Sequence, residues 1–537
     1  MNRKIIPFIT TAVTMSLLSI VFSACGDFLE ETSQDKEYVR SWTDLDELLL
    51  GDCYVPVGMT GPYNTYQNPG MVIHLLADEL TEYTVGSSST DYIVGNHNET
   101  FGARTWQPRI GESPNGTTHY RENFEWKTFY KYINVANNII EYAKDVPQNT
   151  DEEIEGVLKV TGEALFLRGF YYFWLVNFYA KPYDPATAAT DPGVPLKTTS
   201  EVQDILFERN TIKECYERIV SDLTEAELCL EQVRTLKSSL YQADVTAVRL
   251  LLSRVYLYLQ DWPKCVEYAQ KVIDKHPALE DLRTTKAKFM TASNPENIFS
   301  MDGDNLIRMM DRAHQANSVS QELYNAYSIN DLRKNQWFWH YGTFTGLIRR
   351  EPGQSTTTHT PDEEYYYTGY YNLPVTQMRS PVSTVFWLRS AEAYMNLAEA
   401  EAYQKHEEAA KTALRTVLQY RYQPGCSELE LTEVGSSLIS RIREERRLEF
   451  PLEGHRWFDL RRYRVCSVQP EKRALEHTFT IYRDENSGNV VETRLYKLEE
   501  DDISWTVNIP LEVLQFNVGM VDNGNQSRGY QIIATPE

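Results

Sequence analysis

The chain of 537 residues is poor in basic side chains for its size. Lys and Arg number 53 against 76 Asp and Glu, which gives a formal net charge of -23 at pH 7. Nucleic-acid-binding proteins need a basic face that neutralises phosphates, so we expect no nucleic-acid partner. The hydrophobic share of 42% is nevertheless large enough for a substantial core. This composition excludes a disordered or collagen-like protein.

Motifs of catalysis and metal binding are missing from the sequence. It contains no HExxH, GxSxG, P-loop or glycine-rich dinucleotide turn. Its seven cysteines form no CxxC pair, and its ten histidines are dispersed without the spacing of a metal site. We therefore expect no catalytic residues, no metal and no cofactor. Because 76 acidic residues make neighbouring carboxylates inevitable, an all-helical glycosidase stays open as an alternative.

Only one long apolar run occurs, from Ile5 to Phe22 near the N-terminus. Two basic residues precede it, and the small residues Ser23 and Ala24 follow it, just before Cys25. This is the layout of an export signal, and small residues before a cysteine resemble the bacterial lipoprotein box, in which the thiol is acylated. We predict a signal peptide over residues 1–24 and a lipid (palmitate) on Cys25. The alternative is an uncleaved membrane anchor.

Helical periodicity dominates the rest of the chain. Apolar residues recur at three- and four-residue steps, as on one face of a helix. Two such segments, joined at Asp261-Trp262-Pro263, together have about the ~34-residue length of a tetratricopeptide hairpin. Thr150 and Glu153 form a capping-box pattern before another helix, expected from Asp151 to Tyr179. Strands are expected only in minor hairpins, near 478–482 and 490–496.

These patterns predict a mainly α fold, a tetratricopeptide-like helical hairpin scaffold with long loops and minor β-hairpins. We expect residues 25–537 to form a single domain, with helical repeats over roughly 122–180, 211–275 and 384–464. Ordinary helix packing without a repeat is the alternative. Long polar, glycine- and tyrosine-rich stretches separate the helices, and loops of this length are uncommon unless they bind something.

Two long motifs and the tail of the chain stand out. The first motif, GEALFLRGFYYFWLVNFYAKP, covers residues 162–182, and the second, IREERRLEFPLEGHRWFDLRRY, covers residues 442–463. The tail contains Ile509-Pro510 and Gly529-Tyr530. The first motif is similar to a helix of the SusD/RagB family of outer-membrane nutrient-binding lipoproteins. The second is very similar to an element near that family's C-terminal end, and the tail resembles the family's closing run.

The residues of the second motif indicate a packing centre rather than a catalytic one. Arg441 and Glu445 form an i,i+4 pair on a helix that Pro451 and Gly454 end. The motif's aromatic residues supply a core-facing side, and its arginines need acidic partners if they are buried. We expect partners such as Glu449, Glu453 and Asp459 for the arginines Arg446, Arg447, Arg456, Arg461 and Arg462.

The resemblance implies a role in nutrient capture at the outer membrane. Members of the family pack against a SusC-like TonB-dependent transporter and present a carbohydrate ligand, usually a glycan, without changing it chemically. The acidic residues that follow Cys25 resemble a surface-export signal, so we expect the lipid-anchored protein to face the cell exterior. A peptide-binding member of the family and a tetratricopeptide scaffold that recruits a protein are the alternatives.

The resemblance also places the ligand surface on loops outside the helical repeats, around residues 95–106 and 324–341. Tyr and Trp rings stack on the C–H faces of sugars, while amides bind the hydroxyls. The tyrosine cluster at residues 365–371 could equally contact a ligand or a partner. The expected ligand residues are Trp106, Asn96, Asn98, Tyr324, Trp337 and Trp339.

Overall fold

The structure is a computed structural model that describes most of the chain after the N-terminal segment. Cys25, Asn96 and the tyrosine cluster at 365–371 lie outside the described residues. The described residues are 39–55, 69–83, 97–116, 122–201, 203–236, 238–284, 289–301, 317–341, 344–347, 382–483 and 489–535.

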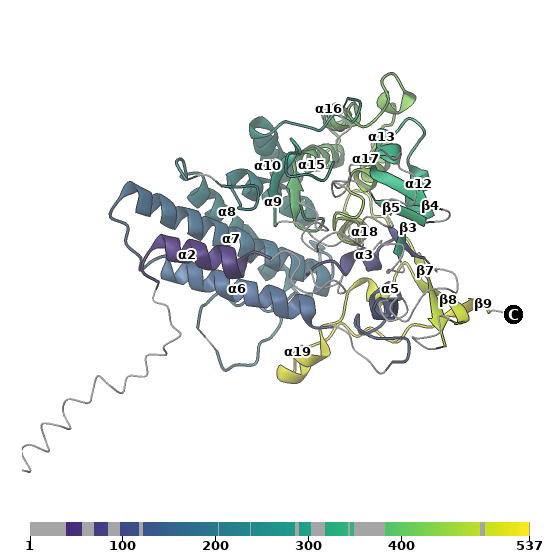
Figure 1. Cartoon of the computed structure of the whole chain (residues 1–537), viewed down its shortest axis with the longest axis horizontal. Coiled ribbons are helices and arrows are strands. Elements are labelled where there is room, and N and C mark those ends of the chain that lie inside the picture. Colours follow the sequence, from purple (N-terminus) through teal and green to yellow (C-terminus); the bar gives the residue numbers. More distant parts are fainter. Residues whose placement is uncertain are drawn as a thin grey trace, which may run out of the picture.

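Helices make up most of the described chain, as expected (Figure 1). In chain order they are α2 (Trp42–Leu48), the π-helix η1 (Leu49–Cys53), α3 (Ile73–Leu76), α5 (Phe101–Arg104), α6 (Phe124–Tyr142), α7 (Asp151–Tyr179), α8 (Ile212–Leu230), α9 (Val245–Leu259), α10 (Trp262–Lys275), α12 (Gln321–Ala326), α13 (Leu332–Trp337), α15 (Ser390–Tyr403), α16 (Glu407–Leu418), the 3-10 helix η4 (Ser427–Leu429), α17 (Gly435–Glu449), α18 (Arg456–Arg464), the 3-10 helix η5 (Ile503–Trp505) and α19 (Leu511–Phe516).

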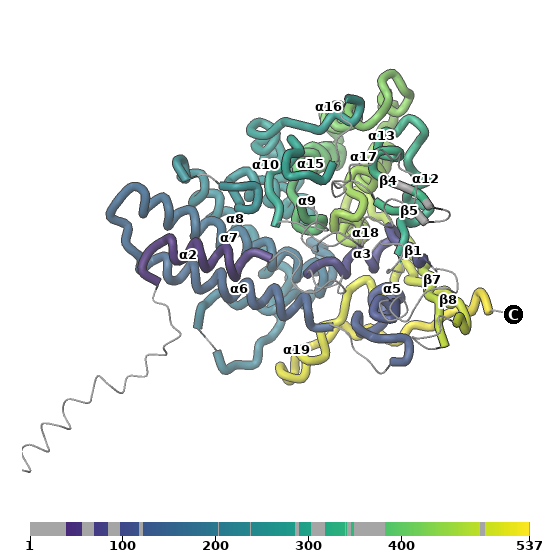
Figure 2. The backbone as a smooth tube through the Cα atoms, in the orientation of Figure 1, coloured from purple at the N-terminus to yellow at the C-terminus, as the bar shows by residue number. Residues whose placement is uncertain are grey.

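The long helices pack in succession, each against the next. α6 contacts α7, α7 contacts α8, and the series continues through α9, α10, α15 and α16. Figure 2 follows this layered path from the purple N-terminal helices through teal to green. The mainly α, tetratricopeptide-like fold predicted from periodicity is therefore confirmed.

Local sequence signals fix where these helices begin and end. Thr150 accepts from the backbone N–H of Glu153 while Glu153 accepts from Thr150, which is the predicted capping box of α7. Asp261 caps α10, whose second residue is a proline, and Gln260 adopts a left-handed conformation (φ 61°) at the end of α9. These residues turn the chain sharply between the two helices.

The strands form small antiparallel sheets, of which the β2–β6 pair contacts the long helix α9. The pairs are β1 with β3, β2 with β6, and β4 with β5, while β7, β8 and β9 form one three-stranded sheet. The predicted hairpin is confirmed as β7 and β8, with Thr478 opposite Leu495, but the third strand β9 was not predicted. The strands are β1 (Leu80–Glu82), β2 (Asn297–Ser300), β3 (Asn317–Val319), β4 (Phe338–Tyr341), β5 (Phe344–Leu347), β6 (Trp387–Arg389), β7 (Leu475–Tyr482), β8 (Val490–Leu498) and β9 (Gln531–Ala534).

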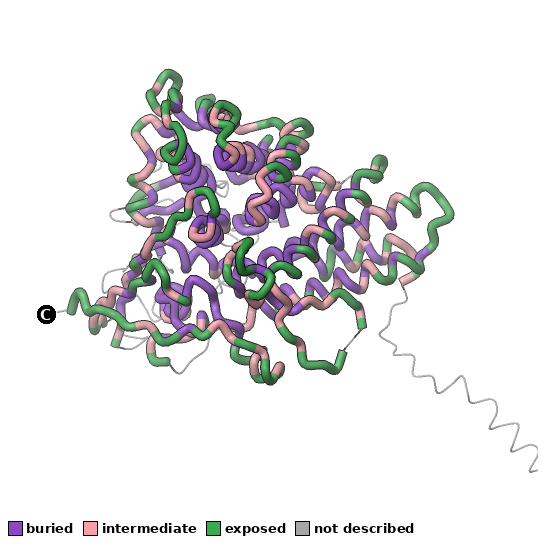
Figure 3. Tube along the Cα trace, turned by 180° about the vertical axis from the view of Figure 1, so that it is seen from behind, coloured by how far each residue is buried: buried purple, intermediate pink, exposed green. Residues whose placement is uncertain are grey.

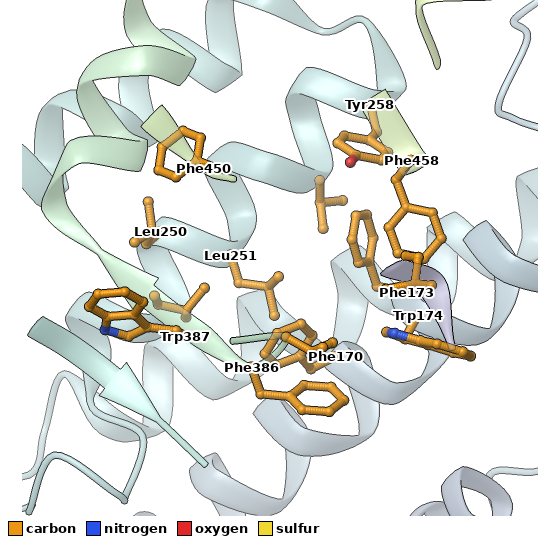
Figure 4. Packing of buried hydrophobic residues seen from close by; sticks show 14 of the residues in the cluster. Phe170, Phe173, Trp174, Leu250, Leu251, Tyr258, Phe386, Trp387, Phe450 and Phe458 are labelled. Atoms are coloured by element: carbon orange, nitrogen blue, oxygen red, sulfur yellow. The ribbon is translucent and has the colours of Figure 1, made fainter. Parts of the chain in front are cut away.

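An aromatic-rich core joins the helical layers to the C-terminal third of the chain. Figure 4 shows rings from α7, from α9 and from the segment around β6 converging with Phe450 and Phe458 of the C-terminal motif. The ring of Trp174 on α7, for example, lies 6.2 Å from that of Phe458 on α18. Figure 3 shows that buried residues fill the interior of the helical layers and of the C-terminal third alike. The second family-like motif is therefore part of the core.

The arginines of this motif are buried, and the expected charge pairing is only partly right. Asp459 does accept from Arg446 (2.9 Å) and Arg462 (2.7 Å) as predicted. Glu449 and Glu453 instead pair with Arg389, an arginine of β6 that lies outside the motif. The predicted i,i+4 pair between Arg441 and Glu445 is present at 2.7 Å.

Arg461 is the clear exception to the expected pairing. It is 1% exposed and donates to the backbone carbonyls of Asn177 and Ala180 at the end of α7, and no carboxylate among the described residues pairs with it. Burial lowers its pKa to about 9. The carbonyls at a helix C-terminus carry partial negative charge, so they take the place of an acidic side chain.

Two further features of the described residues bear on function. No helix among them has the length and apolar character that crossing a bilayer requires. The six described cysteines are all free thiols, and the described residues hold no cluster of His, Cys, Asp and Glu suited to a metal ion.

Candidate ligand-binding surface

The two chain segments expected to bind ligand lie close together in the structure. Asn317 on β3 accepts a hydrogen bond from Arg104 of α5, and Ser318 exchanges hydrogen bonds with the backbone of Thr345 on β5 (2.9 and 3.1 Å). β3 therefore connects residues near 95–106 with the β4–β5 hairpin near 324–341. Figure 1 shows these elements grouped at the side of the molecule opposite α2 and α6.

The neighbouring β7 extends this surface. Thr480 donates its backbone N–H to a carboxylate oxygen of Glu82 on β1 (2.7 Å), and His97 lies 3.2 Å from the same carboxylate. The rings of His97 and Phe479 stack with centroids 4.1 Å apart. The surface is thus built on short strands that are held by side chains from distant parts of the sequence.

A hollow of about 280 Å³ opens between β1, the start of α12 and β7. Arg473 and Glu322 stand at its rim, 3.1 Å apart, with roughly one third of Arg473 and more than half of Glu322 exposed. The full lining is Asp78, Leu80, Thr81, Ser320, Glu322, Arg473, Ala474, Leu475, Glu476 and His477. This mixture of hydroxyl, carboxylate and guanidinium groups offers hydrogen bonds to a polar ligand.

Asp78 is the most strongly held charge in the hollow. Arg456 donates two hydrogen bonds of 2.8 Å to it, and Arg473 lies at 3.3 Å. Burial alone would raise the pKa of Asp78, but Arg456, Arg447 and Arg473 outweigh burial and hold the pKa well below its usual range. The carboxylate therefore stays ionised and is committed to its arginine partners.

The wall of the hollow next to β7 includes a neutral histidine. The ring of His477 stacks on Trp106 with centroids 4.3 Å apart, and its nitrogens lie 2.7 and 3.0 Å from the backbone oxygens of Arg104 and Ala77. Burial and the nearby Arg104 lower the pKa of His477 to about 4. The ring is thus uncharged at neutral pH and serves to pack this wall.

The prediction that Trp106 and Trp337 lie on the ligand surface is wrong. Trp106 is 2% exposed and donates its indole N–H to the backbone oxygen of Leu76 (3.0 Å), so it supports His477 from beneath. Trp337 is fully buried against Phe289, with ring centroids 4.8 Å apart. Neither ring has a free face for a sugar.

The other expected ligand residues have different positions. Tyr324 on α12 is half-buried, with its ring 4.3 Å from His340 and the Lys334 ammonium 4.8 Å from its centroid. Asn98 is also half-buried, in a short helical turn. Trp339 lies on β4 opposite Gly346, but its side chain is outside the described part, as is the whole of Asn96.

A second, larger hollow was missed by the sequence reasoning. It measures about 830 Å³ and lies between β8, the segment at η5 and the C-terminal stretch before β9. Tyr530 is 48% exposed there, although the sequence marks this residue only as part of the closing family-like run. No local pattern distinguishes an exposed tyrosine from a buried one in a chain with 35 tyrosines.

Comparisons with known proteins agree with this architecture. The family profile described as starch-binding associating with outer membrane matches residues 62–257, and the SusD family profile matches residues 269–530. SusD-like protein P2 of Formosa agariphila is 24% identical over 379 residues, which cover 63% of this chain and 71% of that protein.

Two further comparisons differ in how much they cover. SusD-like protein P38 of the same organism is 28% identical over 153 residues, so the match spans 28% of this chain and a quarter of that relative. A crystal structure described as a putative sugar binding protein from Bacteroides vulgatus superposes with a TM-score of 0.65 at 20% identity. That superposition covers 91% of this chain and 99% of the other.

The two family profiles together match most of the chain, and the second of them includes the buried arginine-rich motif at residues 442–463. The protein belongs to the SusD/RagB family.

Proposed function

We propose that the protein is a lipid-anchored receptor on the outer surface of the outer membrane. It binds a glycan, leaves it chemically intact and passes it to a SusC-like TonB-dependent transporter. The whole of residues 25–537 acts as one binding domain, tethered through Cys25. Relatives described as starch-binding or sugar-binding support this proposal, as does the lipoprotein-like layout of the N-terminus.

The observation that carries the proposal is the charge arrangement in the smaller hollow. General acid–base catalysis needs a carboxyl group that can exchange a proton near neutral pH. Asp78 is instead held ionised by three arginines, and Glu322 pairs with Arg447 and Arg473. Such paired groups present fixed hydrogen-bond donors and acceptors, which suit binding of sugar hydroxyls better than hydrolysis.

Calorimetry on the full-length protein in detergent tests the binding step. We expect heat of binding with at least one polysaccharide of a panel that includes amylopectin, xyloglucan and galactomannan, and none with a matched panel of oligopeptides. The substitution Arg473→Gln should weaken that binding, because Arg473 is the partly exposed hydrogen-bond donor at the rim of the smaller hollow. Arg283→Gln, at a similarly exposed arginine elsewhere, is the matched control and should leave binding unchanged.

Product analysis of the same samples tests whether the ligand is left intact. Recovery of the polysaccharide at its original length supports a receptor, whereas new reducing ends would identify a glycosidase and overturn the proposal. Binding of oligopeptides alone would assign the protein to peptide capture instead.

Co-purification tests the transporter partnership. The full-length protein, extracted from outer membranes in mild detergent, should carry a TonB-dependent transporter in a fixed ratio. Protease added to intact cells should cleave the protein if it faces the exterior. Protection from the protease until the cells are lysed would contradict that orientation.

A further inference from the structure

The larger hollow has the features of a binding site of its own. About 830 Å³ in volume, it is bounded by β8 on one side and by the C-terminal stretch on the other. Its lining is mostly polar and comes from three separate stretches of the chain, 495–499, 502–504 and 526–531, together with Glu476 on β7. None of these residues takes part in the buried arginine pairs of the core.

Tyr530 provides the one aromatic ring in this lining. The guanidinium of Arg494 lies 4.0 Å from the centroid of the ring, and Tyr496 contacts it with centroids 5.6 Å apart. A guanidinium covers one face of a ring only, and nearly half of Tyr530 remains exposed. The ring is therefore held against β8 while nearly half of the residue stays exposed, and an exposed aromatic ring can stack on the apolar face of a sugar.

The charges around the ring are almost fully paired within the protein. Arg528 donates two hydrogen bonds to Asp502 (2.8 and 2.9 Å), and Lys497 lies 3.1 Å from Glu499. Glu476 has no ion pair among the described residues. The lining therefore has no cation free to neutralise a ligand, and its surplus charge is negative, which disfavours carboxylated or sulfated sugars.

Glu476 also lines the smaller hollow, so the two hollows adjoin at β7. Glu476 therefore borders both the site rich in fixed hydrogen-bonding groups and the hollow lined by Tyr530, whose ring packs on β8. A ligand that fills both must be longer than a single sugar unit, because each hollow is bounded by different segments of the chain.

We propose that the hollow beside Tyr530 is a second carbohydrate subsite, and that the ligand is an extended, uncharged oligosaccharide that crosses β7 at Glu476 and occupies both hollows. The inference rests on the proposed function, which it makes more specific in ligand length and charge. Tyr530 stacks on a sugar ring in this subsite, while the amides and hydroxyls of the C-terminal stretch bind its hydroxyls.

Tyr530→Ala on the full-length protein is the central test, with Tyr142→Ala as the matched control. Tyr142 is a tyrosine of similar exposure, 44% against 48%, on α6 outside both hollows. The probes are amylopectin, xyloglucan, galactomannan and the anionic polygalacturonate, followed by oligosaccharides of two to eight units cut from the polymer that binds. Tyr530→Phe keeps the ring and checks that stacking, rather than the hydroxyl, is measured.

We expect Tyr530→Ala to weaken binding of the longer oligosaccharides about tenfold and to leave disaccharide binding unchanged, because one stacked ring contributes roughly a factor of ten. Tyr530→Phe and Tyr142→Ala should bind like the unchanged protein. Equal affinities for Tyr530→Ala and Tyr142→Ala would overturn the second subsite and leave the proposed function standing. Preference for polygalacturonate would overturn the uncharged ligand. Failure of the unchanged protein to bind any polysaccharide would instead overturn the proposed function itself.

Discussion

Arg389→Met is the substitution for which the structure predicts the largest loss of stability. Arg389 is 1% exposed and pairs with Glu296 (2.7 Å), Glu449 (2.7 Å) and Glu453 (2.9 Å). It also donates to the backbone oxygen of Glu449 (2.6 Å). Methionine replaces the apolar stem of the side chain but none of these hydrogen bonds.

The size of the expected loss in unfolding free energy depends on which arginine contacts the glutamates keep in the variant. Glu449 still contacts Arg421 (2.8 Å) and Arg333 (3.1 Å), and Glu296 still contacts Arg421 (2.5 Å). Glu453 loses its contact with Arg389. Removing one member of a buried ion pair costs about 3–5 kcal/mol. Because Glu449 and Glu296 keep arginine partners, we expect a value at the lower end of this range, about 3 kcal/mol.

Urea unfolding followed by tryptophan fluorescence measures the change. A chain of this length need not unfold in one step, so the midpoint of the transition that reports the core is compared between variants. Arg283→Met is the control, since Arg283 is 34% exposed and its pair with Asp281 contributes only about 0–1 kcal/mol. Equal midpoints for the two variants would refute the view that Arg389 holds the core together.

The remaining predictions concern pH, close packing and anchoring. Burial raises the pKa of Glu79 to about 8, above its ordinary 4.5, so the folded protein holds a proton that the unfolded chain releases. The free energy of unfolding should therefore fall as the pH rises from about 5 to 8. Glu79→Gln should reduce this fall, whereas the control Glu141→Gln, at an exposed residue, should not. Identical pH profiles for the two variants would contradict the assignment of the pH dependence to Glu79. Gly156→Ala should lower the free energy of unfolding by about 1–3 kcal/mol, because a Cβ atom there would meet the ring of a tryptophan on α2. Gly51→Ala is the control and should have little effect in the same urea assay, because no other atom lies within 4 Å of a Cβ added at Gly51. Cys25→Ala should move the protein from the membrane fraction to the soluble fraction, and its retention in membranes would disprove lipid attachment.

The helical part of the fold could be predicted well from sequence because its signals are local. The capping box at Thr150 directly precedes the helix that it starts, and the predicted bounds of α7, Asp151 to Tyr179, match the structure. Apolar spacing alone would extend α15 back to Leu388. Leu388 instead lies in β6, where pairing with Phe299 replaces helical hydrogen bonds.

Charge pairing was predicted only where both partners lie within the second motif or next to it. Arg462 and Asp459 are three residues apart, and their pair was expected correctly. Arg389 and Glu449 are sixty residues apart, and Arg456 pairs with Asp78 from the far N-terminal part of the chain. No periodicity links such residues, so only the three-dimensional fold identifies them.

The two segments expected to bind ligand lie side by side, but two of the side chains named on them, Trp106 and Trp337, are buried. Loop position alone does not determine burial, and both Trp106 and Trp337 turn inward to fill space beneath short strands. A large aromatic ring contributes more to stability when it is buried than when it is exposed. A tryptophan that belongs to no periodic pattern is therefore more often buried in the core than exposed on the surface. Tyr530 was overlooked for the opposite reason, since it lies in a run that reads as a closing structural motif.

The pairing of Asp78 and Glu296 with arginines from residue 389 onward has a consequence for how the protein matures. Ribosomes complete the N-terminal helices first, yet the acidic groups destined for the interior have no counter-charges until the last third of the chain exists. Burying them earlier would be unfavourable. A polypeptide with this dependence settles into its native form only after its synthesis is nearly finished.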